Sequence, residues 1–308
     1  MACRSAFAVY CSTRICSLLL QQKVQICSLR RVLRRLGKRY QFKYRLRLVA
    51  QNYQQLRMTR VKLTIQYLGK DFCGWQSQKN GVAVQDVVEI ALGKYFDVPF
   101  VRTVAAGRTD VGVHAKGQTA HFDVEKDVNP FKLCLGLNVN LPCTVAVTNA
   151  EVVEENFNAR FSAISKTYCY RVYVSPFRKP LLDQTHLQVY KPLNVAKMQQ
   201  AAALLVGTHD FAAFQKTGSN LKGTVRTVNS FEVVQKQGNV VEFWVNGNAF
   251  LYNQVRLMCG LLLEVGKGRY GAGDVQKMLQ GAKLTYKTLP AHGLTLEEVI
   301  YPTIAQKG

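Results

Sequence analysis

The segment Gly107-Arg108-Thr109-Asp110-Val111-Gly112 places one carboxylate between two glycines and two residues after an arginine. An aspartate two residues before a glycine is a good turn former, because its side chain can accept a hydrogen bond from the backbone two residues further on. The same residue types also suit a ligand site. Glycines let the backbone approach a ligand closely, and an arginine whose side chain meets Asp110 would hold the carboxylate ionised. On these residues alone both interpretations stay open, and the turn is the more ordinary one.

Other residue groups have the types that bind metals. His114 and His121 could form a metal pair, and His209-Asp210 resembles a fragment of a metal phosphohydrolase site. Both groups lack the further ligands that a metal site needs, so local hydrogen bonding or contact with RNA is the better interpretation. The nine cysteines are scattered without a C-x-x-C pair, which predicts reduced thiols in a reducing compartment, without disulfides. We therefore expect no metal.

The charge of the chain narrows the class of partner. Lys and Arg number 41 against 19 Asp and Glu, and this net charge of +22 attracts polyanions by counterion release. Nucleic acid or a membrane surface is therefore the leading partner. The surplus is uneven, because residues 1–60 hold fourteen basic residues and no acid, while residues 61–308 carry +8. No apolar run approaches the roughly 18 residues of a membrane span, so we expect a soluble protein with no membrane partner.

The first 57 residues are rich in arginine and lack acids, which is the composition of an organelle transit peptide. Met58 stands three residues before the first clear strand, so an over-long reading frame that precedes a physiological start at Met58 explains the extension equally well. A basic arm that binds RNA is a third interpretation. We expect a cytoplasmic protein, or a mitochondrial or plastid one where residues 1–57 are a genuine transit peptide.

Two stretches of similar make-up must position Asp110. The first, residues 58–164, has the apolar patterns of strands and helices at 61–67 (strand), 84–95 (helix), 101–105 (strand), 117–124 (strand), 129–137 (helix) and 144–153 (strand). The strand at 117–124 alternates Ala120, Phe122 and Val124, which predicts that one of its faces is buried.

The second stretch, residues 165–308, repeats this make-up. It predicts a strand at 167–174, a helix at 194–207, a hairpin at 224–247 that turns at Gly238-Asn239, and a very apolar helix at 252–266. Two comparable halves that join near 160–166 predict a pseudo-symmetric protein with a cleft between its halves.

Residues 107–124, GRTDVGVHAKGQTAHFDV, resemble the signature loop of the tRNA pseudouridine synthase A family, where a Gly-Arg-Thr-Asp-x-Gly-Val-His-Ala run carries the single catalytic aspartate. Further segments match the family's motifs in the same order: FCGWQSQ (72–78), NFNARFSAISKTYCYRV (156–172), LLVGTHDFAAF (204–214), VRTV (225–228), FLYNQVRLMCGLLLEVGKG (250–268) and LPAHGLTLEEVIY (289–301). YLGKDF at 67–72 departs from the family's Tyr-Asp-Gly-Thr-x-Phe, and the lost acid puts only the local turn chemistry in doubt.

The resemblance implies an isomerase that converts uridine to pseudouridine in the anticodon stem–loop of tRNA, at positions 38–40, with Asp110 as the nucleophile. The uridine must leave the stack before an enzyme can reach its glycosidic bond. Whether Asp110 attacks the sugar C1′ or the base C6, or removes a ribose proton, stays open. None of these routes requires a cofactor or a metal.

The resemblance also assigns residues that bind the substrate. Tyr168 would lie against the target uracil, Arg256 would pair with Asp110, and Arg108 would help to extrude the nucleotide or hold its phosphate. Leu251 would line the uracil pocket. Ordinary alternatives exist for Tyr168 and Leu251 as core residues and for Arg108 as a surface ion pair, whereas Arg256 is a lone cation among apolar residues, which is costly unless it is paired.

Weaker candidates complete the site. Phe250 and Tyr252 could line the pocket or pack in the core. Arg160, Arg226 and Lys166 could contact phosphates or lie at a solvated surface.

The resemblance implies an α+β fold of two ferredoxin-like (RNA-recognition-motif-like) halves that form a continuous central antiparallel sheet, with helices outside and a basic cleft between. It also implies a homodimer in which one tRNA touches both subunits. The alternatives are a pseudouridine synthase that acts on another RNA and a catalytically silent RNA-binding protein. Asp110, Tyr168 and Arg256 together argue against the silent protein.

Overall fold

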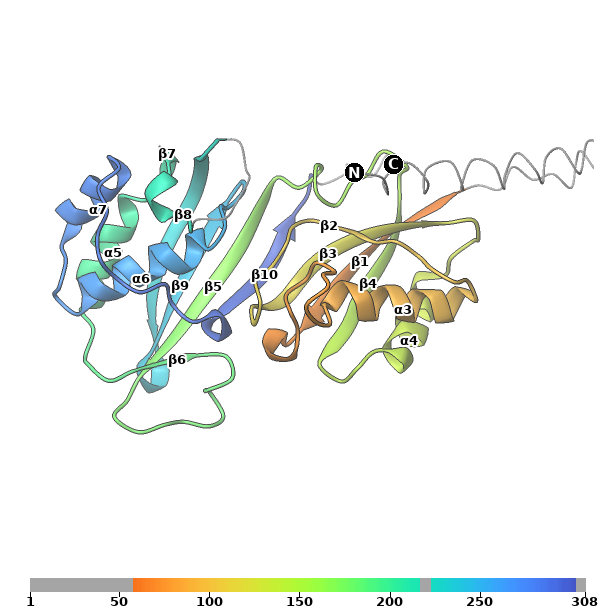
Figure 1. Cartoon of the computed structure of the whole chain (residues 1–308), viewed down its shortest axis with the longest axis horizontal. Helices are drawn as coiled ribbons and strands as arrows, with labels where there is room; N and C mark the ends of the chain where they lie inside the picture. Colours follow the sequence, from red (N-terminus) through yellow and green to blue (C-terminus); the bar gives the residue numbers. More distant parts are fainter. Residues whose placement is uncertain (1–57, 217–222, 303–308) are drawn as a thin grey trace, which may run out of the picture. The chain divides into compact units, whose positions relative to one another are not determined.

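The computed structural model describes residues 58–216 and 223–302, and one mixed sheet runs through this part of the chain (Figure 1). The basic residues 1–57 lie outside the described residues. The elements of the N-terminal half are β1 (Thr59–Tyr67), α3 (Val84–Phe96), β2 (Val104–Ala105), β3 (His114–Val124), α4 (Pro130–Asn140) and β4 (Val145–Val153). Their strands pair antiparallel in the order β4-β1-β3-β2. This is the strand order of a ferredoxin-like β-α-β-β-α-β unit.

The C-terminal half repeats the same connectivity. Its elements are β5 (Ser165–Val174), β6 (Leu187–Val189), α5 (Val195–Ala203), β7 (Gly207–Asp210), β8 (Val225–Lys236), β9 (Val240–Gly247), α6 (Gln254–Gly266), α7 (Ala272–Leu279) and β10 (Leu294–Ile300). The order β10-β5-β9-β8 matches β4-β1-β3-β2 of the first half, and β7 extends the edge beyond β8. The predicted pair of comparable halves is confirmed.

The last strand joins the two halves. β10 pairs antiparallel with β5 and parallel with β3, where Thr295 and Leu296 lie beside His114 and Ala115. All strands therefore belong to one 10-stranded sheet. The predicted continuous sheet is confirmed, with the refinement that the β3–β10 and β5–β6 pairings are parallel.

The register across this junction sets two tyrosines on one face of the sheet. Tyr67 lies opposite Ala115, Ala115 beside Leu296, and Leu296 opposite Tyr168. Because paired residues point to the same side, this row shares one face. The helices of both halves lie on the same side of the sheet in Figure 1, and the apolar side chains of the row belong to the core beneath them. The predicted outer helices thus cover one face only.

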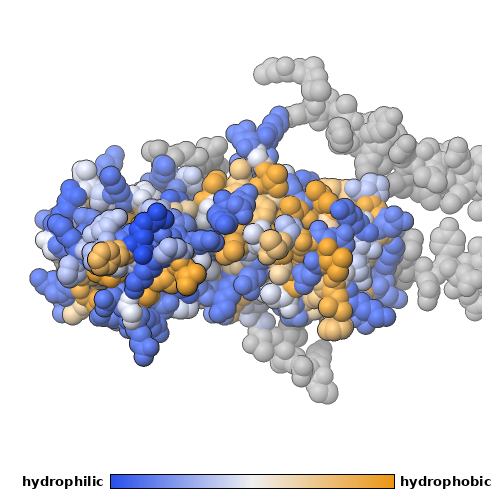
Figure 2. All heavy atoms as spheres, turned by 90° about the horizontal axis from the view of Figure 1, so that it is seen from below, coloured by the Kyte–Doolittle hydropathy of each residue, from blue (hydrophilic) through white to orange (hydrophobic). Residues whose placement is uncertain are grey.

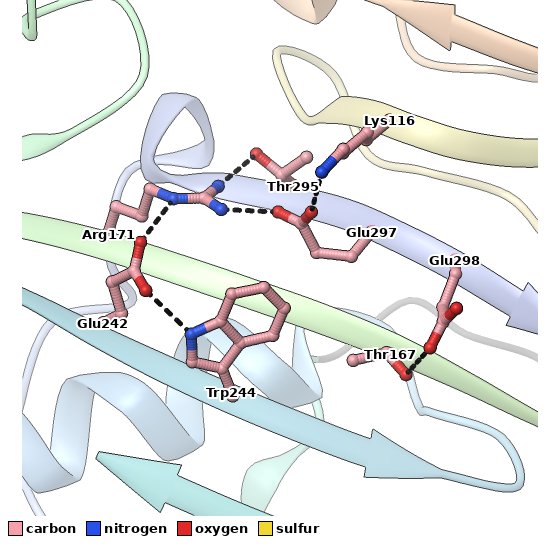
Figure 3. Close-up of polar contacts among 8 residues, drawn as sticks. All are labelled: Lys116, Thr167, Arg171, Glu242, Trp244, Thr295, Glu297 and Glu298. Carbon is pink, nitrogen blue, oxygen red and sulfur yellow. Dashed lines mark hydrogen bonds and ion pairs between the residues drawn. The ribbon is translucent and has the colours of Figure 1, made fainter. Parts of the chain in front are cut away.

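The opposite face carries a network of charged side chains that holds β10 in place (Figure 3). The Arg171 guanidinium on β5 lies 2.7 Å from the Glu297 carboxylate on β10 and 3.1 Å from the Glu242 carboxylate on β9. Trp244 donates from Nε1 to Glu242, and Lys116 on β3 lies 3.8 Å from Glu297. Ion pairs therefore tie strands of both halves together across the junction.

Two sequence predictions need correction. The helix predicted at 194–207 ends at Ala203, because Gly207 has a φ of +116° and begins β7. The strand at 117–124 is buried on both faces rather than one. Phe122 packs against Phe96 of α3, while His121 on the other face accepts a hydrogen bond from the backbone of Ala159.

The outer surface of α4 is apolar where solvated polar residues would be ordinary. Phe131, Leu135 and Val139 recur every four residues and are exposed. Orange side chains interrupt the hydrophilic surface on the right of Figure 2, which is the side of the N-terminal half.

The lengths of the helices and the state of the cysteines bear on the expectations about membrane spans and disulfides. Within residues 58–216 and 223–302, no helix is long and apolar enough to cross a membrane. The five cysteines in these ranges are free thiols, and the other four lie outside the described residues.

Candidate active site

Asp110 opens a tight turn that leads into β3. Its carbonyl accepts a hydrogen bond from the Val113 N–H at 3.1 Å, and the third residue of the turn, Gly112, has a φ of +79°. A left-handed residue at this position is what a type II turn requires, and glycine adopts it without strain. The turn interpretation is therefore correct for the backbone, and it leaves the Asp110 carboxylate 23% exposed.

The backbone before Asp110 is fixed on both sides. The Ala106 N–H donates to the Thr119 carbonyl at 2.8 Å, and the Ala106 carbonyl accepts from Lys166 Nζ at 2.8 Å. Gln118 donates to the Gly107 carbonyl at 2.9 Å. A Cβ on Gly107 would come within 2.8 Å of Lys166 Nζ, so glycine here makes room for a lysine rather than for a ligand.

Thr109 is held from the sheet and from a neighbouring loop. Its hydroxyl shares a hydrogen bond of 2.8 Å with the Tyr67 hydroxyl, and its carbonyl accepts from the Trp75 N–H at 3.3 Å. Tyr67 and Trp75 are both buried, so these contacts are shielded from water. The residue next to Asp110 therefore has a defined position. Tyr67 was not predicted as part of the site, because it lies in the YLGKDF segment (67–72), which differs from the family's motif.

The carboxylate of Asp110 meets a guanidinium from the other half. Arg256, in the first turn of α6, places Nη1 3.3 Å from Asp110 Oδ2, although the two residues are 146 positions apart. Arg256 is itself fixed, because its Nε donates to the Leu289 carbonyl at 2.7 Å and its Nη1 also donates to Asn253 Oδ1. The predicted pairing of Arg256 with Asp110 is present. Asn253 was not predicted as part of the site.

Burial and charge act in opposite directions on this carboxyl group. Burial raises the pKa of Asp110 above its ordinary value, while the Arg256 charge and hydrogen bond, and the Lys216 charge, lower it. Burial is the larger effect, so the pKa is raised on balance. Arg256 thus limits the cost of keeping a partly buried carboxylate ionised.

The Tyr168 side chain on β5 is the next predicted site residue. It is buried and packs edge-on against Phe250, with ring centres 5.4 Å apart. Burial, then Tyr67 and then the Asp110 charge, raise the pKa of Tyr168, so the phenol stays protonated and uncharged. Leu251 is buried one residue further on, and its N–H donates to Gln254 Oε1.

Arg108 does not meet Asp110. Its side chain is exposed, and no ion pair joins it to Asp110 in the part of the chain that the structure describes. The condition under which Arg108 would hold the carboxylate ionised, a contact between the two side chains, is not met, and Arg256 from α6 makes that contact instead. Arg108 is left free to meet a ligand from solvent.

The weaker candidates divide by place. Lys166 lies beneath the catalytic loop, with its pKa lowered by burial and then by the nearby Arg160 charge. Arg160 sits in the loop before β5 and is exposed. Arg226 lies on β8 beside His209, and its Nε is buried without a hydrogen-bond partner. Tyr252 is 44% exposed.

The histidines have structural partners. His114 accepts from the Gly69 N–H through Nδ1 at 2.9 Å and lies 2.9 Å from the Gln184 carbonyl through Nε2. His209 contacts the Val206 carbonyl, and Asp210 accepts from the Ala212 N–H. Among residues 58–216 and 223–302, no group of three or more His, Cys, Asp or Glu side chains could hold a metal ion.

A hollow of about 690 Å³ lies over α3, away from the residues described above. Asp86, Glu89, Lys94 and Asp97 contribute its charges, so it is not the predicted basic cleft. That cleft stays a prediction.

The comparisons with known proteins agree with this arrangement. A family model described as tRNA pseudouridine synthase matches residues 63–162 and 201–302. The chain is 43% identical over 247 residues to tRNA pseudouridine synthase A of Paraburkholderia phymatum, covering 80% of this chain and 92% of that one. It is 41% identical over 246 residues to the protein of that name from Ruminiclostridium cellulolyticum, covering 79% and 100%.

A further relative and a solved structure complete the picture. The tRNA pseudouridine synthase A of Myxococcus xanthus is 44% identical over 246 residues, with 79% of this chain and 92% of that one covered. A chain from the crystal structure of a Cbf5-Nop10-Gar1 complex aligns with a TM-score of 0.33 and 13% identity, over 66% of this chain and 45% of that chain.

Proposed function

Because the chain belongs to the tRNA pseudouridine synthase family, we propose that it isomerises uridine to pseudouridine in tRNA, with Asp110 as the nucleophile. The observation that supports this most directly is the Asp110–Arg256 pair, which holds a partly exposed carboxylate at a fixed turn. A protein that only binds RNA has no use for a carboxylate where phosphates approach. The presence of the Asp110 carboxylate, together with the Arg256 guanidinium from the other half, favours catalysis over binding alone.

The reaction needs one carboxylate and no external reagent. After the uridine leaves the stack, Asp110 attacks, the N1–C1′ bond breaks and the detached uracil turns in the site. A bond then forms between C5 and C1′, the bond to Asp110 breaks, C5 loses its proton and N1 gains one, so the product is an isomer of the substrate. Attack at C1′ and attack at C6 both fit this balance, and so does removal of a ribose proton by Asp110, provided that the proton returns to the sugar.

We propose that Tyr168 lies against the turning uracil. Its ring is fixed by Phe250, and its hydroxyl is protonated because burial raises its pKa. A neutral phenol can give a hydrogen bond to the base without adding a negative charge beside Asp110. Leu251 would contribute an apolar wall, and exposed Arg108 would meet the phosphate of the extruded nucleotide.

We propose the anticodon stem–loop as the target, and a homodimer in which one tRNA contacts both subunits. Folded RNA is recognised by shape and backbone contacts, which favours a large basic surface shared between two subunits. Light scattering on the purified protein tests the dimer, and a mass of one subunit at micromolar concentration would contradict it.

The test of function is a map of pseudouridines. Total tRNA from cells with and without this protein is treated with a carbodiimide specific for pseudouridine, and reverse-transcription stops are read. Stops that disappear from the anticodon arm support the proposal. Stops that disappear only from another RNA would favour an isomerase with a different target, and an unchanged map would favour the silent RNA-binding protein.

We propose that the protein acts in the cytoplasm. Fluorescent fusions that begin at Met1 and at Met58 test this, because a transit peptide within residues 1–57 would send only the longer fusion to mitochondria or plastids.

A further inference from the structure

Phe161 is a large apolar side chain with no place in the core. It is 79% exposed, although it lies only a few residues before β5 and the buried Tyr168. Exposed single apolar residues are common, and loops are generally more mobile than the elements they connect. The segment around Phe161 is tied down instead, so the ring is held out by the fold.

The loop that carries Phe161 is fixed by hydrogen bonds on both sides. Asn158 Oδ1 accepts from the backbone N–H groups of Arg160 and Phe161 at 2.9 and 3.2 Å. The Asn158 carbonyl accepts from the Ser162 N–H at 2.8 Å, and the Ser162 hydroxyl accepts from the Asn158 N–H at 2.9 Å. The backbone on either side of the exposed ring is therefore pre-organised.

The loop is also attached to the sheet. The Ala159 N–H donates to His121 Nδ1 at 3.1 Å, and the Ala159 carbonyl accepts from the Tyr301 hydroxyl at 2.7 Å. The backbone two residues before Phe161 is thus anchored to buried or half-buried side chains, so little backbone entropy is lost when the ring binds a partner.

One cation lies over the ring, and a second basic residue contacts the loop that precedes Asp110. The Arg160 guanidinium lies over the Phe161 ring, 5.5 Å from its centre. The Arg160 charge helps to lower the pKa of Lys166. Lys166 Nζ donates a hydrogen bond to the carbonyl of Ala106, four residues before Asp110. In the described ranges, Arg160, Lys166 and Arg108 have no carboxylate partner, so this side of Asp110 carries uncompensated positive charge.

We propose that Phe161 and Arg160 form a stacking platform for an unpaired nucleobase that neighbours the target uridine. An aromatic face beside a planar guanidinium is the surface on which proteins stack single-stranded bases. The positive charge beside it favours an RNA strand over an apolar protein segment as the occupant. This proposal rests on the proposed function, because it places the flanking base of the same RNA.

The test uses anticodon-arm hairpins with 2-aminopurine, a fluorescent base, at each position next to the target uridine. Binding is measured in the Asp110→Asn background, where the RNA is not converted. We expect the fluorescence of one flanking position to change on binding, and Phe161→Leu to remove that change and weaken binding about tenfold. Phe161→Trp keeps an aromatic face and should keep both.

Phe177 supplies a matched control. It is 78% exposed, but it follows the far end of β5, about 30 Å along a strand of ten residues. Phe177→Leu removes an equally exposed aromatic ring and should leave the fluorescence change and the affinity as they were.

Three results would overturn the platform. They are an unaltered signal in Phe161→Leu, an equal loss in Phe177→Leu, and a change of oligomeric mass in Phe161→Leu, which would place the ring at a subunit contact. The wild-type protein decides the proposed function separately. If it forms pseudouridine in tRNA while Phe161→Leu binds normally, only the platform fails.

Discussion

The Nη1 atom of Arg256 that lies 3.3 Å from Asp110 Oδ2 also donates a hydrogen bond to the side chain of Asn253. Asn253 is 6% exposed and has a φ of +62° just before α6 begins. A left-handed backbone is unusual for a residue with a side chain. The amide is thereby aimed back at the first turn of α6, where it fixes the guanidinium that faces the Asp110 carboxylate.

Replacement of Asn253 by glycine should slow the reaction without harming the backbone, because glycine adopts the left-handed region freely. We expect kcat/KM to fall about ten- to a hundredfold. Arg256 loses the hydrogen bond that anchors it, so it no longer holds the Asp110 carboxylate in one orientation. The pH profile of kcat/KM checks this, and its acid limb should move to higher pH.

Asn239 provides the control for that substitution. It has a φ of +60° in the exposed turn between β8 and β9. Asn239→Gly makes the same backbone change away from the site and should leave the pH profile in place. If both variants behave alike, the role of Asn253 is structural only.

Arg256→Gln should raise the pKa of Asp110 further. Burial already raises this pKa, and the Arg256 charge opposes burial. Without that charge, a larger fraction of Asp110 is protonated at any given pH, so activity is lost from the acid side sooner. Arg256→Lys keeps the charge, and its limb should lie between those of the wild type and Arg256→Gln. A limb that stays unmoved in Arg256→Gln would show that Asp110 does not set it.

Asp110→Asn should abolish conversion and retain tRNA binding. The amide keeps the shape of the side chain but cannot act as an ionised nucleophile, so we expect a loss of roughly 10⁴-fold or more in kcat. Single-turnover conversion and filter binding measure the two properties. Asp123→Asn, which breaks the 2.7 Å ion pair with Arg60, is a matched carboxylate change that should convert tRNA normally. Normal turnover by Asp110→Asn would refute the catalytic assignment.

Tyr67→Phe should destabilise the fold by about 1–2 kcal/mol, because it leaves the buried Thr109 hydroxyl without its partner. Thr109→Val should do the same from the other side. Since both single variants remove one interaction, the double variant should cost less than the sum of the two. Urea unfolding of all four proteins gives the coupling, and strictly additive losses would exclude it.

His114 should make the fold less stable below neutral pH. Burial lowers the pKa of its imidazole below the ordinary 6.5, and its Nδ1 must be unprotonated to accept from Gly69. The stabilisation is therefore full above pH 6.5 and is lost as the pH falls towards the lowered native pKa, because the unfolded chain takes up the proton first.

His114→Asn should accordingly flatten the decline in unfolding free energy between pH 7.5 and pH 5.5, while lowering stability at pH 7.5 by about 1–3 kcal/mol. Burial lowers the pKa of His121 and His186 as well, so part of the decline should stay. Urea midpoints at the two pH values measure it. A slope identical to that of the wild type would contradict the prediction.

Local patterns were sufficient to predict most of the elements. The hairpin turn at Gly238-Asn239 is present, and both residues have positive φ within the loop of three residues, Gln237–Asn239, that joins the paired Lys236 and Val240. The resemblance located the contact between Asp110 and Arg256 across 146 positions. No local pattern could have done so, since a single sequence does not record which distant residues meet.

What the sequence could not supply depends on contacts between distant segments. Arg108 and Asp110 are near neighbours in sequence and do not meet, because the turn at Asp110 sends the carboxylate towards Arg256 on α6. Tyr67 reaches Thr109 only because β1 and β3 pair in one register. His121 is buried because a loop of residues 156–164 covers the second face of β3.

The position of β10 has a consequence for biosynthesis. Until residues 294–300 have been translated, the facing edges of β3 and β5 lack the strand that lies between them. Unpaired strand edges invite association with other chains, so a nascent polypeptide is vulnerable to aggregation until residues 294–300 leave the ribosome. A polypeptide that ended before residue 294 would contain both Asp110 and Arg256 and would still lack the strand that joins the two halves of the sheet.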